Sequence, residues 1–403
     1  MRSGRSWGRL GMTLNDYLIG VVDNRGKNPK HYYDNSKYPV LDNYLIKNEL
    51  YPNMNDCKRY IDQDTFDSFL RGYTYKGMVV MTLVGNGIGN VTTIPSDGIV
   101  IIQNTIGFVP DTAKLDNRYL YYFFLSNIDY IKKFDRGSGQ PSIKKTDILN
   151  IEVDYPQLSV QKQISGVLSS LDEKIAINTA INENLEQQAQ ALFKAWFVDF
   201  EPFGGAMPDD WQNISVYDLA DYINGAAFKK AEYGDFGLPI IKIAELKSGI
   251  TDSTQYCCVS KDDKYYIDDK DILFSWSGNP DTSIDTFLWS RGKAILNQHT
   301  FRVVSKYNAP AFTFFLLKYL KPQFAHIASN KQTTGLGHIT VADLKRLQFC
   351  TNDTAIADFE SLTAPIFDTL FSISKENQRL ATLRDTLLPK LMNGEIDVSE
   401  VNI

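Results

Sequence analysis

The sequence has few of the features that mark a membrane protein, a disulfide framework or a metal site. Its four cysteines, Cys57, Cys257, Cys258 and Cys350, include no CxxC pair, and its four histidines are scattered along 403 residues. No apolar run approaches the roughly 18 residues that span a bilayer. Unpaired cysteines are typical of a reducing compartment. We therefore expect a cytoplasmic protein with no membrane association and no metal site.

The sequence also lacks the motifs of common enzyme classes. It has no G-x-x-x-x-G-K-[ST] phosphate loop and no [ND]-P-P-[FY] tetrapeptide of the kind that amino-methyltransferases use. The segment Gly85-Asn86-Gly87-Ile88-Gly89 is rich in glycine, but no helical pattern follows it. It therefore predicts a hairpin turn and not a dinucleotide-binding loop. We expect this chain to be no enzyme by itself and to hold no cofactor.

A stand-alone nuclease is one alternative. Pro110-Asp111 together with Asp172-Glu173-Lys174 supplies the residue types of such a site. The second group is expected on the solvated face of a long helix, where charges of this kind are routine. Metal-dependent cleavage by the purified chain alone would test this alternative.

What the sequence does contain is a duplication. Two long segments about 195 residues apart carry the same seam of mostly apolar residues, spaced by alternating fours and threes. The first seam contains Ile164, Leu168, Leu171, Ile175, Asn178, Asn182, Leu185, Ala189, Leu192 and Trp196, and the second contains Ile366, Leu370, Ile373, Asn377, Leu380, Arg384, Leu387 and Leu391. This spacing keeps one narrow stripe of a helix facing a partner helix. We therefore predict two long helices, one over about 160–197 and one ending at Asn393-Gly394, packed antiparallel as a coiled coil.

The seams contain asparagines at equivalent positions, Asn182 and Asn377. A polar residue in such a seam lowers stability but specifies the register of the two helices. The alternative is a poorly packed polar turn with no such role.

Each long helix follows a region that mixes strands with helices. The predicted strands are Val79–Val84, Gly98–Ile102 and Ile151–Tyr155 in the first region, and Pro239–Ile243, Ile272–Trp276 and Phe301–Val304 in the second. One buried helix is expected in each region, over 119–131 and 311–320. The predicted fold is α+β: two mixed α/β domains joined by two long antiparallel coiled-coil helices, with an internal pseudo-two-fold repeat.

The negative charge is concentrated on the helices. Residues 157–203 contain six acids and three bases, and residues 352–403 contain nine acids and four bases. The net charge of −6 for the whole chain therefore leaves the two mixed regions close to neutral. Because local patches and not totals determine binding to nucleic acid, this balance permits a DNA partner without requiring one.

Both mixed regions contain a polar, glycine-rich loop at equivalent places, over 137–145 and 330–338. Glycine lets backbone N–H groups approach phosphates, lysine neutralises them, and glutamine or asparagine can pair with adenine. Either loop alone predicts no more than a solvated turn, but the recurrence favours DNA contact. The candidate DNA-binding residues are Lys27, Lys30, Asn86, Gln103, Asn104, Ser138, Gln140, Lys144 and Lys145 in the first region, and Lys229, Lys230, Lys242, Ser275, Ser277, Asn279, Asn297, Gln298, His299, Lys331, Gln332, Thr333, Thr334 and His338 in the second.

After residue 12 the chain resembles the specificity subunit of a type I restriction-modification system over nearly its whole length. The resemblance is carried by Met81–Asn86 with Gln103–Thr105, Gly139–Ile143, Pro156–Leu158 with Gln161–Ile164, Leu171–Ile175, Trp196–Phe203, and Leu383–Leu391 with Gly394–Ile396. It implies target-recognition domains at 13–155 and 204–350, each of which reads one half of a split DNA sequence. The first 12 residues match nothing in this pattern and are expected to be a flexible tail or an expression remnant.

The resemblance also implies partners. The helical regions 156–203 and 351–403, well kept across the family, would act as spacer and as docking surface for two modification subunits. Those subunits would use S-adenosylmethionine to methylate adenine N6, and restriction subunits with ATP and magnesium would add cleavage. The candidate coil and docking residues are Ile164, Leu171, Asn182, Leu185, Trp196, Phe197, Ile366, Asn377, Leu380 and Leu387. The alternative is a coiled-coil adaptor that joins proteins without binding DNA.

Overall fold

The computed structural model describes residues 11–26, 28–332 and 335–398. The chain divides into two compact units. Unit 1 consists of residues 1–176 with 380–403, and unit 2 consists of residues 177–379. The two boundaries between the units fall within the two long helices. Each unit therefore contains one mixed region and part of each helix. The candidate residues Lys27, Thr333 and Thr334 lie outside the described residues.

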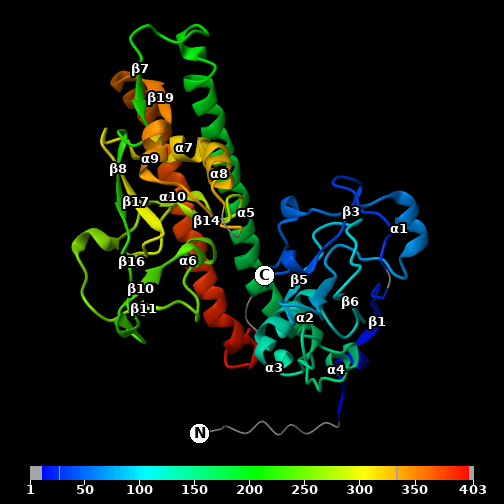
Figure 1. Ribbon diagram of the computed structural model, residues 1–403. Helices are drawn as coiled ribbons and strands as arrows, with labels where there is room; N and C mark the ends of the chain where they lie inside the picture. The colour runs from blue at the N-terminus through cyan, green and yellow to red at the C-terminus, as the bar shows by residue number, and fades with distance from the viewer. Residues whose placement is uncertain (1–10, 27, 333–334, 399–403) are drawn as a thin grey trace. The chain divides into compact units, whose positions relative to one another are not determined.

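Unit 1 is built around a four-stranded antiparallel sheet with the strand order β1-β6-β4-β5 (Figure 1). Its elements, with η for a short 3-10 helix, are η1 (Leu14–Tyr17), β1 (Leu18–Val22), β2 (Tyr38–Pro39), η2 (Asn43–Leu45), η3 (Met54–Asp56), β3 (Tyr60–Ile61), α1 (Gln63–Phe69), β4 (Val79–Thr82), β5 (Val91–Thr93), β6 (Thr105–Pro110), α2 (Asn117–Ser126), α3 (Ile128–Lys132), α4 (Lys145–Leu149) and the start of α5 (Leu158–Phe197). Strand β4 is buried along its whole length, as a central strand rich in valine should be.

Unit 2 contains a four-stranded antiparallel sheet of order β15-β13-β17-β8 and a second sheet of order β12-β16-β10-β11-β9. Its elements after α5 are η4 (Glu201–Phe203), β7 (Gln212–Ser215), β8 (Ala220–Asn224), η5 (Lys230–Glu232), β9 (Tyr233–Gly234), β10 (Leu238–Ile241), α6 (Ile243–Ser248), β11 (Tyr256–Cys257), η6 (Asp263–Tyr265), β12 (Tyr266–Ile267), β13 (Ile272–Ser275), β14 (Ser277–Gly278), β15 (Asp285–Leu288), β16 (Ala294–Leu296), β17 (Thr300–Ser305), α7 (Pro310–Tyr319), α8 (Lys321–Ser329), β18 (Gly337–His338), α9 (Val341–Arg346), β19 (Gln348–Thr351) and α10 (Asp353–Met392).

The two four-stranded sheets repeat the same topology. In each, the first strand pairs with the last, the last pairs with the middle strand, and the middle strand pairs with its hairpin partner: β1-β6-β4-β5 in unit 1 and β8-β17-β13-β15 in unit 2. Two helices follow the last strand in both units, α2 and α3 after β6, and α7 and α8 after β17. The predicted internal repeat of mixed α/β regions is confirmed.

Some predicted strands of unit 1 are wrong. In the segment 98–102 only Val100 makes a β-bridge, to Val40, and in 151–155 only Glu152 does, to Thr13. Unit 2 has full strands at the equivalent places, β16 paired in parallel with β10, and β19 paired with β7. The apolar run at 98–102 is therefore buried by packing, without the ladder of hydrogen bonds that its composition suggested.

Two other predicted boundaries need correction. The single helix expected over 119–131 is interrupted at Asn127, where the backbone leaves the helical region (φ −110°, ψ 16°) and the side-chain amide donates to the Phe123 carbonyl at 2.8 Å. Such local bonding by asparagine competes with helix continuation. The strand expected at 239–243 ends at Ile241, because Lys242 begins the cap of α6.

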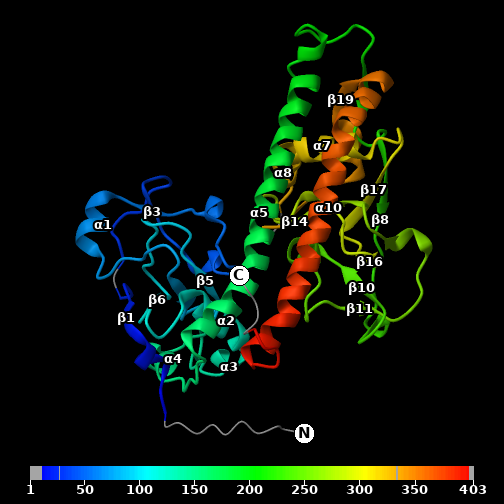
Figure 2. The same cartoon turned by 180° about the vertical axis from the view of Figure 1, so that it is seen from behind.

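The two long helices, α5 and α10, contain 40 residues each and pack antiparallel. In unit 2 they lie side by side (Figures 1 and 2), and the Asn178 amide donates to the Asn377 carbonyl oxygen at 2.9 Å while that of Asn182 donates to the Ser374 hydroxyl at 3.2 Å. In unit 1 Arg384 donates to Asp172 at 2.7 Å. The residue numbers of the contacts rise along α5 while they fall along α10, which confirms the antiparallel pair.

The seam pattern predicts correctly that the two helices pair, but it gives the wrong surroundings for Asp172 and does not include Phe193. Asp172 was expected on a solvated face, yet its side chain is only 4% exposed and accepts hydrogen bonds from Arg384 and Tyr122. This burial also removes Asp172 from the alternative nuclease site. Phe197 is buried in the core of unit 2 among other aromatic rings, as is Phe193, which the seam pattern missed.

Candidate nucleic-acid interface

Three polar loops meet at one end of the four-stranded sheet of unit 1. The loop before β6 meets the end of β4 where the Leu83 N–H donates to the Asn104 carbonyl at 2.6 Å. The glycine-rich loop joins them, because the Gly85 N–H donates to the Pro141 carbonyl at 2.9 Å and Val84 pairs with Ser142 in a β-bridge. Segments far apart in sequence, near 84, 104 and 140, therefore form one surface.

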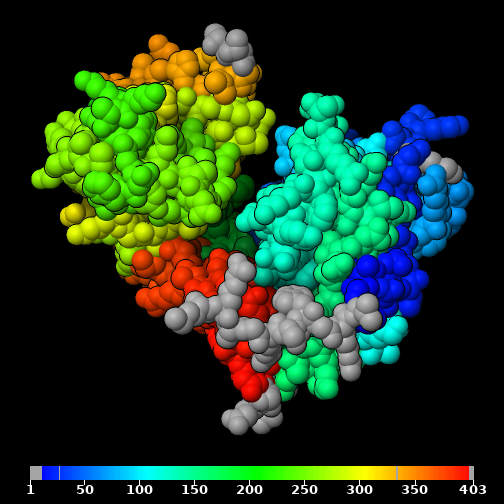
Figure 3. Space-filling view, turned by 90° about the horizontal axis from the view of Figure 1, so that it is seen from below, coloured from blue at the N-terminus to red at the C-terminus, as the bar shows by residue number. Residues whose placement is uncertain are grey.

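The glycine-rich loop of unit 1 has a defined conformation. One carboxylate oxygen of Asp135 accepts from the N–H groups of Gly137 at 2.9 Å and Ser142 at 2.8 Å, and these bonds lower the pKa of Asp135. A Cβ on Gly137 would lie 1.8 Å from the Gln140 carbonyl oxygen, so only glycine fits there. The space-filling view shows the segment from α3 to α4, coloured cyan to green, at the surface of unit 1 (Figure 3).

A salt bridge ties this loop to the helix that follows it, and unit 2 repeats the arrangement. In unit 1 Arg136 pairs with Asp147, in the first turn of α4, at 2.8 Å. In unit 2 Lys331 pairs with Asp343, in the first turn of α9, and this carboxylate also accepts from the Thr340 N–H at 2.8 Å. The equivalence of the two loops, inferred from sequence alone, extends to the contacts that hold them.

The three loops of unit 1, together with the segment that follows β1, line a shallow hollow of about 570 Å³. Its lining is polar and consists of Arg25, Gly26, Asn28, Val84, Gln103, Asn104 and Gln140. The Gln103 amide donates to the side-chain carbonyl of Asn28. The hollow thus presents a guanidinium and several amides, which are the groups that hydrogen-bond to base edges in DNA grooves.

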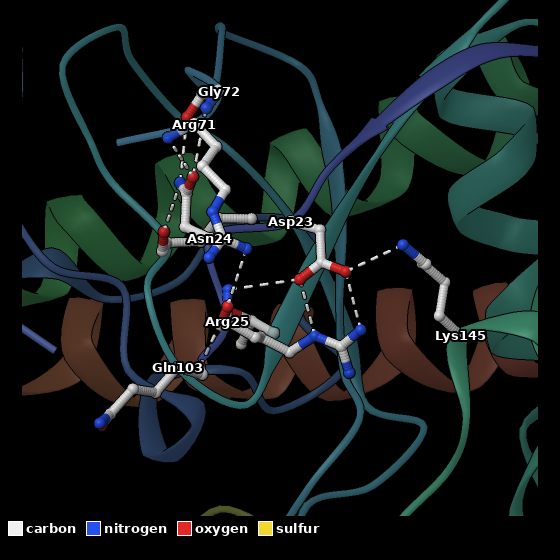
Figure 4. A network of polar contacts seen from close by, with 9 residues as sticks. Asp23, Asn24, Arg25, Arg71, Gly72, Gln103 and Lys145 are labelled. Carbon is white, nitrogen blue, oxygen red and sulfur yellow. Dashed lines mark hydrogen bonds and ion pairs between the residues drawn. The ribbon is translucent and has the colours of Figure 1, made fainter. Parts of the chain in front are cut away.

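Arg25 has a fixed place beside this hollow (Figure 4). Its Nε and Nη2 atoms donate to the two carboxylate oxygens of Asp23, both at 2.8 Å, and the Lys145 ammonium lies 3.1 Å from Asp23 Oδ2. The bond from Arg25 holds the pKa of Asp23 well below its usual range, in spite of the carboxylate's partial burial. Asp23 therefore stays ionised and orients the guanidinium.

A buried asparagine fixes the backbone next to this pair. The amide nitrogen of Asn24 donates to the carbonyls of Gly72 at 3.0 Å and Ile101 at 2.9 Å, and its oxygen accepts from the Arg71 N–H at 2.8 Å (Figure 4). All the polar atoms of this side chain are engaged, so the segment that carries Arg25 is rigidly attached to its neighbours. Sequence reasoning missed both Arg25 and Asn28, because a single Asp-x-Arg triplet after a strand carries no recognisable signal.

Unit 2 builds the same meeting point from different side chains. Trp276 follows β13, its indole N–H donates to the Asn224 side chain at 3.2 Å, and its ring lies 5.6 Å from that of His299. Strand β14 pairs with β18, which forms the end of the second glycine-rich loop, so Ser277 lies opposite His338. The interface of unit 2 is therefore aromatic and imidazole-rich where that of unit 1 is rich in amides and guanidinium.

Most candidate residues are accessible. The exposed ones are Lys30, Asn86, Ser138, Gln140, Lys144, Lys229, Lys230, Asn279, His299, Gln332 and His338, and the half-buried ones are Gln103, Asn104, Lys145, Lys242, Ser277, Gln298 and Lys331. Asn104 has a left-handed backbone (φ 61°), which gives it a structural reason to be asparagine.

Two candidates of unit 2 are corrected by burial. Ser275 lies in the central strand β13 with no exposed surface, so it has no access to DNA. Asn297 is 9% exposed, and its side-chain oxygen accepts from the His299 N–H, so it shapes the loop more than it faces solvent. Both residues were chosen from polarity alone, which does not separate the two faces of a strand.

The coil and docking candidates are mostly occupied within the chain. Leu171, Asn182, Leu185, Trp196, Ile366, Asn377, Leu380 and Leu387 are half-buried, and Ile164 and Phe197 are buried. Ile164 and Phe197 are therefore core residues and not surface docking residues. On these two helices, the outward faces are the surfaces that remain accessible.

Comparison with known proteins identifies the family. The model of the type I restriction modification DNA specificity domain matches the chain twice, over residues 19–187 and 208–351. The chain is 27% identical over 332 residues to the MjaIX specificity subunit of Methanocaldococcus jannaschii, covering 76% of this chain and 72% of that one. It is 22% identical over 404 residues to the HindI specificity subunit of Haemophilus influenzae, covering 80% and 87%.

A solved structure shows the same fold. The type I restriction-modification S subunit from M. genitalium aligns with 97% of this chain and 98% of its own length, at a TM-score of 0.57 and 15% identity. No helix among the described residues is long and apolar enough to cross a membrane. The chain belongs to the type I restriction-modification specificity subunits, which are not the catalytic subunits of these systems, and the family expected from its motifs is confirmed.

Proposed function

We propose that this subunit recognises a split DNA sequence, one half with the mixed region 13–155 and the other with 204–350. The observation that carries the proposal is the repeated meeting point of three loops, held by equivalent contacts in each unit. Two equivalent sites with different side chains suit a target with two different halves. A partner with a single binding surface would need only one such site. A DNA target also favours the cytoplasmic location expected from the cysteines.

The side chains of the two sites favour different half-sites. In unit 1 the hollow offers Arg25, Gln103 and Gln140, whose donors and acceptors suit hydrogen bonding to purine edges in the major groove. In unit 2 the pair Trp276 and His299 offers aromatic faces and ring nitrogens in place of the guanidinium. Exposed lysines around both sites, such as Lys144 and Lys230, would contact phosphates and position the bases without specifying them.

The paired helices would set the gap between the half-sites. Each helix of 40 residues is about 60 Å long at 1.5 Å per residue. Half-sites about one turn of DNA apart, roughly 34 Å, present the same groove face to both recognition regions. Deleting one heptad from both helices should therefore change the gap or abolish binding.

The partners would supply the chemistry. We expect two modification subunits, which use S-adenosylmethionine to methylate adenine N6, and restriction subunits, which use ATP and magnesium to cleave DNA. The outward faces of the acidic helices α5 and α10 are the docking surfaces that remain after their seams are filled. Light scattering of the co-expressed assembly would give its mass, and from this the number of copies of each partner.

A genome-wide map of N6-methyladenine tests the proposal. Cells that keep the modification subunit are compared with and without this chain. Loss of a split motif with two defined halves and a fixed gap would support the proposal. An unchanged methylation map, together with no retardation of duplex DNA by the complex, would favour the adaptor alternative instead.

A further inference from the structure

We propose that Arg25 reads a guanine in the half-site of unit 1, and that Asp23 and Lys145 act as the positioning residues for it. This inference rests on the proposed function, because it assigns a base to one of the two recognition sites. It is a prediction about the DNA sequence that the subunit recognises, drawn from the geometry of one side chain.

The guanidinium of Arg25 has one edge occupied and one edge available. Asp23 takes the edge formed by Nε and Nη2, with two hydrogen bonds of 2.8 Å. Among the described residues, Nη1 donates to no acceptor, and this nitrogen points away from Asp23 (Figure 4). The edge formed by Nη1 and Nη2 still has two donors, and guanine presents two acceptors, O6 and N7, at the matching spacing in the major groove.

The occupied edge makes the available edge more selective. Arg25 is held by two side-chain bonds to Asp23 and by its own N–H, which donates to the same carboxylate at 3.3 Å. Asp23 is fixed in turn by Lys145 at 3.1 Å, and only 18% of its side chain is exposed. A side chain ordered before binding loses less conformational entropy when it binds, and a fixed direction rejects bases whose acceptors lie elsewhere.

The surroundings match a base edge in charge and in shape. Asp23 faces two cations, Arg25 and Lys145, so the cluster has a net positive charge. The other polar groups that line the hollow are the neutral amides of Asn28, Gln103, Asn104 and Gln140. A metal ion would find no free carboxylate in this lining. A simple anion could pair with the guanidinium but would leave the amides without partners, whereas neighbouring bases can bond to them as well.

The equivalent place in unit 2 makes the inference specific to one half-site. In the register of the paired strands, Val22 faces Gly107 in unit 1 and Ile223 faces Arg302 in unit 2. Arg25 therefore corresponds to Ala226, and Asp23 corresponds to Asn224, which accepts from Trp276. Ala226 is 4% exposed and has no donor beyond its backbone, so unit 2 cannot make the same contact. Loss of Arg25 should therefore affect one half of the motif only.

The experiment maps the methylation motif in cells that carry the full complex with Arg25→Ala or Asp23→Asn. Arg25→Ala should reduce discrimination at one G·C position of one half-site by roughly 5- to 150-fold, and leave the other half-site unchanged. Asp23→Asn should relax the same position by a smaller factor. The control is Lys76→Ala, because Lys76 is an exposed cation of unit 1 that precedes β4, whereas the hollow lies beyond the other end of that strand, at Val84.

Three outcomes are decisive. Relaxation at a single G·C position, with the motif of Lys76→Ala unchanged, supports the inference. A motif that Arg25→Ala leaves intact, or a uniform loss over both halves, overturns it while the split motif of the natural chain still supports the proposed function. Absence of any split motif with the natural chain overturns the proposed function itself. Circular dichroism of the purified variants confirms that the fold is kept.

Discussion

The two units differ where the long helices meet their mixed regions. In unit 1 Asp172 of α5, Arg384 of α10 and Tyr122 of α2 form a buried polar cluster, with bonds of 2.7 Å from Arg384 and 2.6 Å from Tyr122 to the carboxylate. The equivalent positions in unit 2 hold Phe367, Ala189 and Phe315, all buried in an apolar core. At this contact between the long helices and the mixed region, unit 1 thus has an ion pair and unit 2 has apolar side chains.

Another cluster shows the opposite difference. In unit 2 Lys318 of α7 bonds to Glu186 of α5 at 3.1 Å and to Asp285 at 3.4 Å. The positions equivalent to Lys318 and Glu186 in unit 1 hold Leu125 and Ala381. Each mixed region is therefore matched to its own segment of the helices, because exchange would leave a buried charge facing an apolar group. The duplicated halves have become specific for their places in the chain.

Breaking the ion pair of unit 1 should have the largest effect. Asp172→Ala leaves Arg384 without its buried partner, and we expect a loss of about 3 to 5 kcal/mol in the unfolding free energy of unit 1. With Trp7, which belongs to unit 1, replaced by phenylalanine in every variant, the four remaining tryptophans, at 196, 211, 276 and 289, all lie in unit 2, so their fluorescence reports on that unit. In urea unfolding, part of the transition measured by circular dichroism should move to a lower urea concentration, whereas the transition measured by tryptophan fluorescence should stay in place.

The matched control gives the three positions of the unit 1 cluster the residues that unit 2 has at the equivalent positions. Asp172→Phe combined with Arg384→Ala and Tyr122→Phe removes all three polar groups together, and should recover most of the stability lost in Asp172→Ala. A single variant as stable as the natural chain would show that the ion pair contributes nothing to unit 1.

Alkaline pH should separate the units by a smaller amount. Helix α2 of unit 1 has Tyr119, Tyr121 and Tyr122 where α7 of unit 2 has phenylalanine, and burial raises the pKa of all three phenols above the usual 10. Their protonated form is favoured in the fold, so their contribution is complete below about pH 10 and is lost as the pH rises toward the folded pKa. The loss is about 1.4 kcal/mol per pH unit for each such group.

Two optical signals check this difference. Tyrosinate absorbance near 295 nm follows ionisation, and tryptophan fluorescence follows unit 2, which has one strongly shifted tyrosine of its own, Tyr222. Unit 1 should unfold at a lower pH than unit 2. Loss of tryptophan signal before tyrosine ionisation would contradict the comparison.

The two glycine-rich loops should differ in how their lysines act. Lys144 is exposed, so Lys144→Ala should weaken DNA binding about equally for all sequences and reduce the salt slope of binding by about 1. Lys331 anchors its loop to Asp343, so Lys331→Ala should also change the motif of the second half-site. Fluorescence anisotropy at several salt concentrations measures the slope. An unchanged slope for Lys144→Ala would remove Lys144 from the interface.

The seam asparagines should give the smallest effects, in opposite directions. Asn178→Leu removes the amide that donates to Glu376 and Asn377 and should cost unit 2 about 1 to 3 kcal/mol. The Asn182 amide nitrogen donates only long hydrogen bonds, of 3.2 Å to the Ser374 hydroxyl and 3.4 Å to the Leu370 carbonyl, and its oxygen is buried with no hydrogen-bond partner among the described residues. Asn182→Leu should therefore be neutral or stabilise unit 2 by up to about 1 kcal/mol. Tryptophan-detected urea unfolding measures both, and equal losses would contradict the difference in their bonding.

The long-range architecture was predictable because periodic patterns extend over many residues. The two helices, their antiparallel pairing and the matching of 137–145 with 330–338 all follow from spacing that is visible in the chain. The weaker strands of unit 1 were not predictable, since a buried apolar run such as 98–102 has the same composition whether or not a neighbouring strand completes its ladder.

The candidate site was predictable in its loops and not in its orienting contacts. Gln103, Gln140 and His299 lie in or beside the places expected. Arg25 was missed because the hollow that gives it a role is completed by distant residues such as Gln103 and Gln140. Asp172 was misplaced because its partner, Arg384, is 212 residues away. Single-residue chemistry of this kind is determined by tertiary contacts, which have no local pattern.

The measurement that tests the two-site account most directly is the methylation motif of paired variants of the full complex. One variant carries Gln103→Ala and Gln140→Ala in unit 1, and the other carries Gln298→Ala and His299→Ala in unit 2. The account predicts that each variant relaxes positions in one half of the split motif, a different half in the two cases, with the gap unchanged. Relaxation of the same half by both variants, or of neither half, would contradict it.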